Sequence, residues 1–501
     1  MAVNGESSAE HHDRHPHQHG SIETRLFINN EFVDSRSGKM FPVINPATEE
    51  VTAKVQEAGD ADVELAVQAA EAAFPAWSEL SGFQRATYFY KLADLYERNN
   101  DKLARLEAMS MGRPVSTYTE GLASARFLRY MAGKATDIQG ESSLQTAGFM
   151  SVTLRQPFGV CAAVTPWNAP VTMLTFKMAP ALIAGNTLVA KSSEKAPLTS
   201  LFVARLIKEA GFPPGVVNIL NGFGTPCGVS LASHLRIRKI SFTGSVKAGK
   251  AVLEAAARSN LKKVTLELGG KSPLIVFDDA DIVKAADASA KSILLNSGQA
   301  CIASSRVFVH SGILSQFCDA LVESLQKLGS NPDSGNDPLL PTTRRGPQAT
   351  KSQFDSILTH IKEAKASGYR ILHGGNREGP KGFFIEPTVI FQPDEQSRVV
   401  REEIFGPVIC LSSFEDEKDV VQRANDSEYG LYASVFTRDI FRALRIAKTF
   451  EAGNVGVNVS SPMMTHDMPF GGWKQSGIGK ELGMYSVKEW TDLKTVYFAL
   501  S

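Results

Sequence analysis

The sequence predicts an α/β protein with two doubly wound parallel sheets and a small separate β element. Short runs that are apolar throughout, such as VCAAV at residues 160–164, alternate with helical patterns. This alternation is typical of parallel sheets that helices cover on both faces. It pauses at Gly270 and restarts at residues 274–277, which indicates a second sheet. Strands at 151–155 and 496–500 look exposed, so they are either candidates for pairing with another chain or ordinary edge strands.

The composition is that of an ordinary globular protein of two to four domains. The 501 residues are 43% hydrophobic, and 53 basic side chains balance 53 acidic ones. A net charge of zero gives no support for nucleic-acid or membrane-surface binding. No uncharged apolar run reaches about 18 residues, so we expect no membrane-spanning helix. The five cysteines form no disulfide framework and no zinc pattern, which favours a reducing, cytoplasmic location.

Residues 1–23 differ from the rest of the chain. They hold five of the ten histidines, and acidic and small polar residues lie between them. The segment lacks the apolar stretch of a signal peptide. We expect a disordered, solvated tail, and a loose metal-ion site remains the alternative. No metal cofactor is expected.

The first folded residues predict a hairpin followed by two helices. Strands at Leu26–Ile28 and Glu31–Val33 flank an Asn-Asn turn. Apolar residues at helical spacing predict one helix over residues 60–74, ended by Pro75, and a second over residues 84–108.

Two series of strands follow, and ligands of such sheets lie beyond the carboxyl ends of the strands. The first series occupies residues 160–164, 187–190, 216–220, 238–242 and 264–268, with helices from 172 and over 199–210. The second occupies residues 274–277, 307–309, 388–390, 408–413, 433–436 and 455–459, with helices over 281–295 and 312–327.

Cys301 is a candidate nucleophile. It lies in the run GQACIASS, directly after a predicted helix, and its small neighbours leave the thiol approachable. A loop rich in backbone N–H groups can lower a thiol pKa from its usual ~8.5. The alternative is that this lone cysteine is a small core residue.

Two further side chains follow strands and suit the same chemistry. Asn168 lies between two prolines in TPWNAP, where a rigid amide can donate to an oxyanion, or the residue simply forms a turn. Glu267 ends an apolar strand, where burial would raise its pKa and suit a general base. A salt-bridged glutamate at a domain junction is the alternative for Glu267.

Other residues after strands suggest a dinucleotide site. A carboxylate such as Glu194, in KSSE, can accept from a ribose hydroxyl and repel a 2′-phosphate, although a solvated loop fits equally. Gly224 and Gly244 lie in glycine-containing turns that would let backbone N–H groups approach a pyrophosphate, or they form plain turns.

Together these motifs resemble the aldehyde dehydrogenase superfamily, in its hydrolytic, acid-forming type. The resemblance covers all but the first 23 residues. Its specific motifs are TPWNAP at 165–170, FTGS at 242–245, ELGGK at 267–271, GQAC at 298–301, EEIFGP at 402–407 and FGGWKQSG at 470–477.

The resemblance implies a role for each residue. Cys301 would be the nucleophile, Glu267 the base for the deacylating water, and Asn168 an oxyanion donor beside the Cys301 N–H. Lys177 and Glu481 would relay a proton. The cofactor would be NAD, bound by Trp167, Lys191, Glu194, Gly224, Gly244, Ser245, Leu268, Glu403 and Phe405. Ser192 replaces the usual proline after the lysine and would loosen that turn.

The resemblance also implies a division of the chain into domains and an assembly. The NAD-binding domain would comprise residues 24–140 and 159–270, the catalytic domain 271–480, and the oligomerisation strands 141–158 and 481–501. The partners would be a small aldehyde and further copies of the chain, in a homodimer or homotetramer.

The expected substrate mouth is apolar, which predicts a neutral aliphatic or aromatic aldehyde. Residues 460–468 would set selectivity, with His466 as a loop residue and not a catalytic one. The expected lining is Ala169, Thr172, Met173, Phe176, Leu295, Ala300, Ile302, Met463 and Phe470. An NADP-preferring or semialdehyde-specific enzyme, or an inactive family member with a binding role, remain alternatives.

Overall fold

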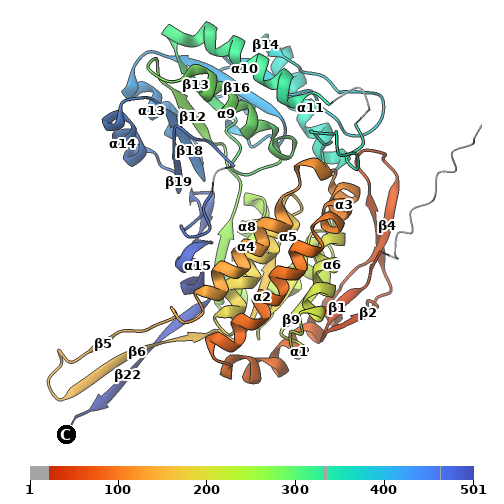
Figure 1. Ribbon diagram of the computed structural model, residues 1–501, viewed down its shortest axis with the longest axis vertical. Helices are drawn as coiled ribbons and strands as arrows, with labels where there is room; N and C mark the ends of the chain where they lie inside the picture. The colour runs from red at the N-terminus through yellow and green to blue at the C-terminus, as the bar shows by residue number, and fades with distance from the viewer. Residues whose placement is uncertain (1–21, 332–335, 463, 501) are drawn as a thin grey trace, which may run out of the picture.

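The computed structural model describes residues 22–331, 336–462 and 464–500. The histidine-rich tail therefore lies almost wholly outside the described residues. Figure 1 shows two lobes and a thin arm that projects from the lower lobe and carries the C-terminus. Among the described residues, no helix combines the length and apolarity needed to cross a membrane.

The lower lobe is built on a sheet that has eight strands among the described residues. Its central strands are parallel, and antiparallel strands lie at both edges. In spatial order the strands are β2 (Glu31–Val33), β1 (Leu26–Ile28), β9 (Val217–Asn221), β8 (Thr187–Ser192), β7 (Val160–Val164), β10 (Lys239–Thr243), β11 (Lys263–Glu267) and β21 (Gly477–Ile478).

Helices cover both faces of this sheet, which explains why its central strands are apolar throughout. Cys161 and Ala163 of β7 belong to the core on one face, whereas Val160 and Ala162 belong to the core on the other. The helices of the lobe are α1 (Asp60–Glu79), α2 (Gly82–Arg98), α3 (Asn100–Met111), α4 (Glu120–Gly133), α5 (Pro170–Ile183), α6 (Pro197–Glu209), α7 (Val229–Ser233), α8 (Val246–Ser259) and α15 (Gly483–Glu489).

The upper lobe repeats this design with a second sheet. It is parallel except for β14 at one edge. In spatial order the strands are β14 (Arg370–His373), β15 (Thr388–Phe391), β16 (Val408–Phe414), β13 (Arg306–His310), β12 (Pro273–Val276), β18 (Tyr432–Phe436) and β19 (Asn454–Val457). Its helices are α9 (Ile282–Leu294), α10 (Leu314–Gly329), α11 (Lys351–Ala366), α12 (Arg398–Arg401), α13 (Glu417–Asn425) and α14 (Ile440–Thr449).

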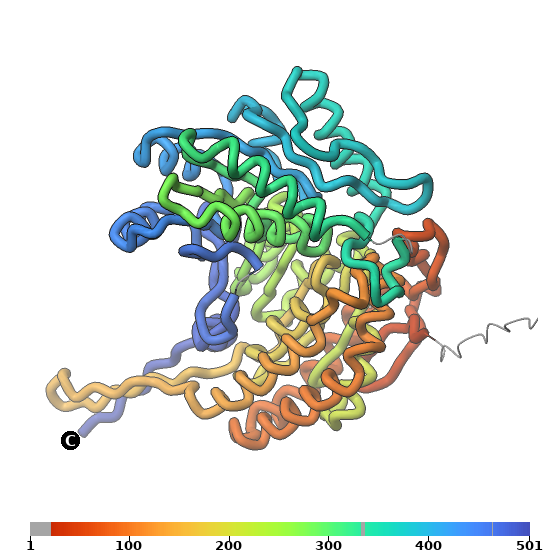
Figure 2. Tube along the Cα trace, turned by 45° about the horizontal axis from the view of Figure 1, so that its top comes forward, coloured from red at the N-terminus to blue at the C-terminus, as the bar shows by residue number. Residues whose placement is uncertain are grey.

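The arm is a small antiparallel sheet of β22 (Thr491–Ala499), β6 (Phe149–Pro157) and β5 (Ser142–Ser143). The two strands expected to be exposed therefore pair with each other. Figure 2 shows the arm standing clear of both lobes in a second view. Tyr497, Leu493 and Leu144 on it are more than half exposed. Two short ribbons complete the fold, β3 (Met40–Ile44) with β4 (Val51–Gln56) and β17 (Tyr429–Gly430) with β20 (Trp473–Lys474).

Two helix boundaries differ from the sequence expectation. Pro75 does not end its helix, which continues to Glu79. The proline removes one backbone hydrogen bond. The extra turn, however, buries Trp77, whose indole N–H donates to the carbonyl of Leu182 at 3.2 Å. Burial of such a large ring offsets the lost bond.

The helix predicted over residues 84–108 is two helices, because the chain breaks at Asn99. The Asn99 side-chain amide donates to the carbonyl of Leu95 at 2.8 Å. Such a local bond competes with the helix ladder. The second helix, α3, ends at Met111, where Gly112 adopts φ 85°.

Candidate active site

A cleft of about 950 Å³ opens at the carboxyl ends of β7, β8, β10 and β11. This is the edge at which parallel sheets bind ligands. Residues of both lobes line it. The lining includes three predicted catalytic residues and all the predicted cofactor-binding residues. They are Asn168, Glu267, Cys301, Trp167, Lys191, Glu194, Gly224, Gly244, Ser245, Leu268, Glu403 and Phe405. Lys177 and Glu481 are outside the lining.

A strained turn after α9 presents the thiol of Cys301 to the cleft. Asn296, Ser297 and Gly298 have φ values of 48°, 56° and 78°. Positive φ is uncommon for residues other than glycine and is concentrated at functional sites. A Cβ atom at Gly298 would lie 2.1 Å from the carbonyl carbon of Gly406, so only glycine fits. The turn is thus pressed against the EEIFGP segment.

The loop after β11 packs directly on the nucleophile. A Cβ atom at Gly270 would lie 2.2 Å from the carbonyl oxygen of Cys301. Burial raises the pKa of the Cys301 thiol well above its usual range, and the Glu267 and Glu403 carboxylates raise it further. The sequence-based expectation of a lowered pKa is therefore wrong. Burial and nearby negative charge together outweigh the backbone N–H group.

Glu267 is a buried carboxyl group at the end of β11, and 3% of it is exposed. Burial raises its pKa, and the neighbouring Glu481 raises it further, as expected for a general base. One of its oxygens, Oε1, has no hydrogen-bond partner within the described residues. Glu481 forms an ion pair with the fully buried Lys177. The described residues give Glu267 no ion pair, so the salt-bridged alternative is not supported.

Asn168 is fastened to the turn that holds Cys301. Its side-chain amide donates to the carbonyl of Gln299 at 3.0 Å. Its own carbonyl accepts from the Asn296 amide at 3.0 Å and from the Arg113 guanidinium at 2.5 Å. An amide group has two N–H donors, so one remains for an oxyanion.

The pyrophosphate end of a dinucleotide fits the turn between β10 and α8. Gly244 has no side chain there, and a Cβ atom would lie 2.6 Å from the Phe242 ring. Ser245 is the N-cap of α8, and its hydroxyl accepts from the Ala248 N–H at 3.3 Å. The free N–H groups of a helix N-terminus favour an anion at this position.

The adenosine end fits the carboxyl end of β8. The Lys191 ammonium is buried and donates to the carbonyls of Ser192 at 2.9 Å and Gly222 at 2.7 Å. The expectation of a loosened turn at Ser192 is not supported. Its hydroxyl donates to the Asn221 amide oxygen at 2.7 Å and joins β8 to β9. Glu194 is half-buried at the rim.

The nicotinamide end fits a buried carboxylate. Burial raises the pKa of Glu403 to about 7. Its Oε1 accepts from the Gly270 N–H at 3.0 Å, and a Cβ atom at Gly269 would lie 2.2 Å from its Oε2. The Phe405 ring meets the Trp167 ring edge-on at 5.5 Å. The residues present therefore suit a dinucleotide along its length.

The substrate side of the cleft contains the expected apolar residues, and charged residues line it as well. Met463 lies outside the described residues, and the other expected residues line the cleft. Arg113, Glu120 and Arg126 line it too, so the mouth is not wholly apolar as expected. His466 also contributes, packed edge-on against Phe127 at 5.5 Å and Phe176 at 5.9 Å. These residues carried no recognised motif in the sequence.

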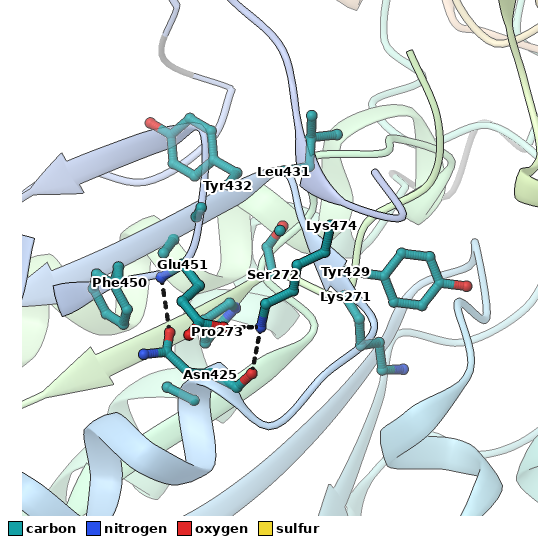
Figure 3. A pocket seen from close by; sticks show the side chains of 14 residues that line it. Lys271, Ser272, Pro273, Asn425, Tyr429, Leu431, Tyr432, Phe450, Glu451 and Lys474 are labelled. Carbon is teal, nitrogen blue, oxygen red and sulfur yellow. Dashed lines mark hydrogen bonds and ion pairs between the residues drawn. The ribbon is translucent and has the colours of Figure 1, made fainter. Parts of the chain in front are cut away.

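A second hollow lies where the two lobes join. Figure 3 shows that side chains, Lys474 among them, occupy it. The Lys474 ammonium fills it, pairing with Glu451 and donating to the carbonyl of Asn425 at 2.6 Å. Its volume is about 10 Å³. That is room for about one water molecule, so this hollow stabilises the junction and is no ligand site.

Comparison with known proteins agrees with this geometry. A sequence profile of the aldehyde dehydrogenase family matches residues 32–496. Aldehyde dehydrogenase 1A1 of Homo sapiens is 46% identical over 485 residues, 95% of each protein. An aldehyde dehydrogenase of Emericella nidulans is 44% identical over 477 residues, again 95% of each. The NAD⁺ complex of an aldehyde dehydrogenase from Bacillus cereus superposes with a TM-score of 0.92 at 40% identity, covering 96% of this chain and 97% of that one.

Proposed function

This chain belongs to the aldehyde dehydrogenase family and is an NAD-dependent aldehyde dehydrogenase, and we propose that it forms a carboxylic acid through a thioester on Cys301. The observation that carries the proposal is the convergence of Cys301, Glu267 and Asn168 on one cleft. A thiol, a buried base and an amide donor are the groups that acyl chemistry on an aldehyde requires.

In the first step the Cys301 sulfur adds to the aldehyde carbon. Because its pKa is raised, the thiol must lose its proton as the aldehyde arrives, and Glu267 is the nearby carboxylate suited to take it. The oxyanion that forms accepts from the Asn168 amide and from the Cys301 N–H. Such donors contribute ~3–4 kcal/mol when aimed at developing charge.

NAD, when bound, supplies the acceptor for the hydride that leaves the aldehyde carbon. The residues that would hold it are Lys191 and Glu194 at the adenosine ribose, Ser245 at the pyrophosphate and Glu403 at the nicotinamide ribose. Glu194 favours NAD, because its carboxylate repels a 2′-phosphate.

In the second half of the reaction Glu267 takes a proton from water, which attacks the thioester and releases the acid. The Lys177–Glu481 pair lies behind this carboxyl group, and both residues change its pKa through their charges. We assign this pair the removal of the proton from Glu267 after each half of the reaction, first so that the carboxylate can act on the water and then so that it is ready for another turnover.

The lining of the mouth supports a neutral aliphatic or aromatic substrate. Met173, Phe176 and Phe470 are apolar, and Arg113 is paired with Glu120. A second candidate, an aldehyde that also carries a carboxylate, is favoured by one observation: Arg126 is exposed at the mouth and pairs with no acidic group among the described residues. Comparing a neutral aldehyde with an anionic one of equal length in the wild type and in Arg126→Met separates the two candidates.

The arm supports self-association, since its strands expose large apolar side chains such as Leu493, Tyr497 and Phe498. We propose a homodimer or homotetramer in the cytoplasm, in which case light scattering should give a multiple of the chain mass. All five cysteines are free, as a reducing compartment requires.

The reaction is tested by mixing the protein with NAD and a panel of aldehydes while following absorbance of the reduced coenzyme. We expect turnover by the wild type and none by Cys301→Ser. Cys318→Ser is the matched control, because Cys318 lies on α10 away from the cleft. Full turnover by Cys301→Ser would contradict the mechanism.

A further inference from the structure

A buried cluster of charges lies beside Asn168 and has no part in the steps above. It consists of Glu107, Arg113 and Glu120, whose side chains are 0%, 12% and 5% exposed. Removing three charged groups from water costs several kcal/mol for each ion, and their attraction offsets this only when the geometry is good. Apolar side chains of similar size would fill the space at lower cost, so the cluster needs an explanation other than stability.

The Arg113 guanidinium group contacts three groups, one through an ion pair alone and two through hydrogen bonds. Its Nε lies 3.1 Å from Oε1 of Glu107, and its Nη1 pairs with Oε1 of Glu120. Its Nη2 donates to the backbone carbonyl of Asn168 at 2.5 Å. The planar guanidinium fixes these directions relative to one another, which a lysine cannot do.

Glu120 holds the same segment from the other side. Its second oxygen, Oε2, accepts from the backbone N–H of Thr172 at 3.1 Å, in the first turn of α5. Arg113 and Glu120, themselves paired, thus hold a carbonyl and an N–H that are four residues apart. Between these two points lies the turn from Asn168 to Pro170.

Glu107 completes the charge pattern behind Arg113. Burial raises its pKa well above the usual range, the Glu120 charge raises it further, and Arg113 opposes both. The described residues offer no hydrogen bond to either carboxyl oxygen of Glu107. Its contact with the guanidinium is therefore an ion pair without a hydrogen bond.

The geometry points to Arg113 and Glu120 as positioning residues that fix the Asn168 amide against the Cys301 turn. This inference rests on the proposed role of Asn168 as oxyanion donor. The amide already touches that turn through Gln299 at 3.0 Å, so a shift of its backbone moves the second N–H away from the forming oxyanion. A displacement of about 1 Å at a reacting centre can lower the rate about 100-fold.

A double-mutant cycle tests the inference. Arg113→Lys keeps the positive charge between the two carboxylates but removes the hydrogen bond to the Asn168 carbonyl. We expect kcat/KM for aldehyde to fall about tenfold or more, with the Kd for NAD unchanged. In an Asn168→Ala background the same substitution should change kcat/KM by less than about twofold, because the amide that it positions is absent. Arg129→Lys, on the surface of α4, is the matched control and should leave both values unchanged.

The outcomes separate this inference from the proposed function. An undiminished rate in Asn168→Ala alone would refute the role of the amide itself. Activity lost in Asn168→Ala but kept in Arg113→Lys would refute only the positioning. Equal losses from Arg113→Lys in both backgrounds would show a general structural role and overturn the inference. If Arg113→Lys does not fold, Glu120→Gln enters the same cycle with the same expected result.

Discussion

The two ends of the cleft are built in different ways. At the coenzyme end, residues follow the strands of a parallel sheet, and at the adjoining Cys301 turn Gly270 and Gly298 have no room for a Cβ atom beside neighbouring backbone. At the aldehyde end, the wall comes from α4, the first turns of α5 and Pro462, Met464 and His466, and side chains determine its shape. The first end is fixed by backbone packing and the second by exchangeable side chains.

The largest effect on turnover should come from a substitution of Glu267, which lies where the coenzyme end meets the aldehyde end. Glu267→Gln should lower steady-state turnover by about 10²–10⁴, because the thioester loses its base. If acylation is retained, one equivalent of reduced coenzyme should still appear in a rapid burst, which stopped-flow absorbance measures. Glu363→Gln, in an exposed ion pair, is the control. Loss of the burst together with turnover would show that the first step depends on Glu267 as much as the second does.

A smaller effect is expected from narrowing the aldehyde end alone. Leu295→Phe adds volume to the lining and should raise KM for bulky aromatic aldehydes about tenfold, because overfilling a packed site costs about 1–3 kcal/mol. KM for short aldehydes and the Kd for NAD should not change. A changed Kd for NAD would show that the two ends are not independent.

The matching change at the coenzyme end should be smaller still. Glu194→Gln removes a charge that repels a 2′-phosphate by about 1 kcal/mol, so kcat/KM with NADP should rise roughly fivefold. Initial rates with both coenzymes at saturating aldehyde measure this change. The wild-type rate with NADP serves as the reference. A gain for NAD instead would contradict the role given to Glu194.

The smallest expected change is a shift in pH dependence. Glu267 is a negative neighbour that raises the pKa of Cys301, so Glu267→Gln should lower that pKa. A lower pKa gives more thiolate at neutral pH, and alkylation of Cys301 by iodoacetamide should then begin at lower pH. Identical alkylation profiles for both proteins would show that the Glu267 charge does not contribute to this pKa.

The same contrast explains what the sequence could predict. The alternation of apolar strands and helices identified both sheets, and motifs directly after strands located the residues of the coenzyme end. Helix ends were harder, because the helix continues past Pro75 where Trp77 bonds to Leu182 and breaks where Asn99 bonds to Leu95. The contacts of Arg113 with Asn168 and of Glu120 with Thr172 join residues more than fifty positions apart. No local pattern encodes such pairs, and a Gly-Arg-Pro turn indicates only a helix break.

One contact has a consequence for heat stability. The chain leaves the lower sheet at Glu267 and enters the upper sheet at Pro273, and between them Gly270 touches the carbonyl of Cys301. The distance between base and thiol therefore depends on how the lobes are packed together, beyond the integrity of either sheet. On heating, loosening of the lobe interface is enough to separate the two groups. Inactivation is accordingly expected at a lower temperature than loss of secondary structure.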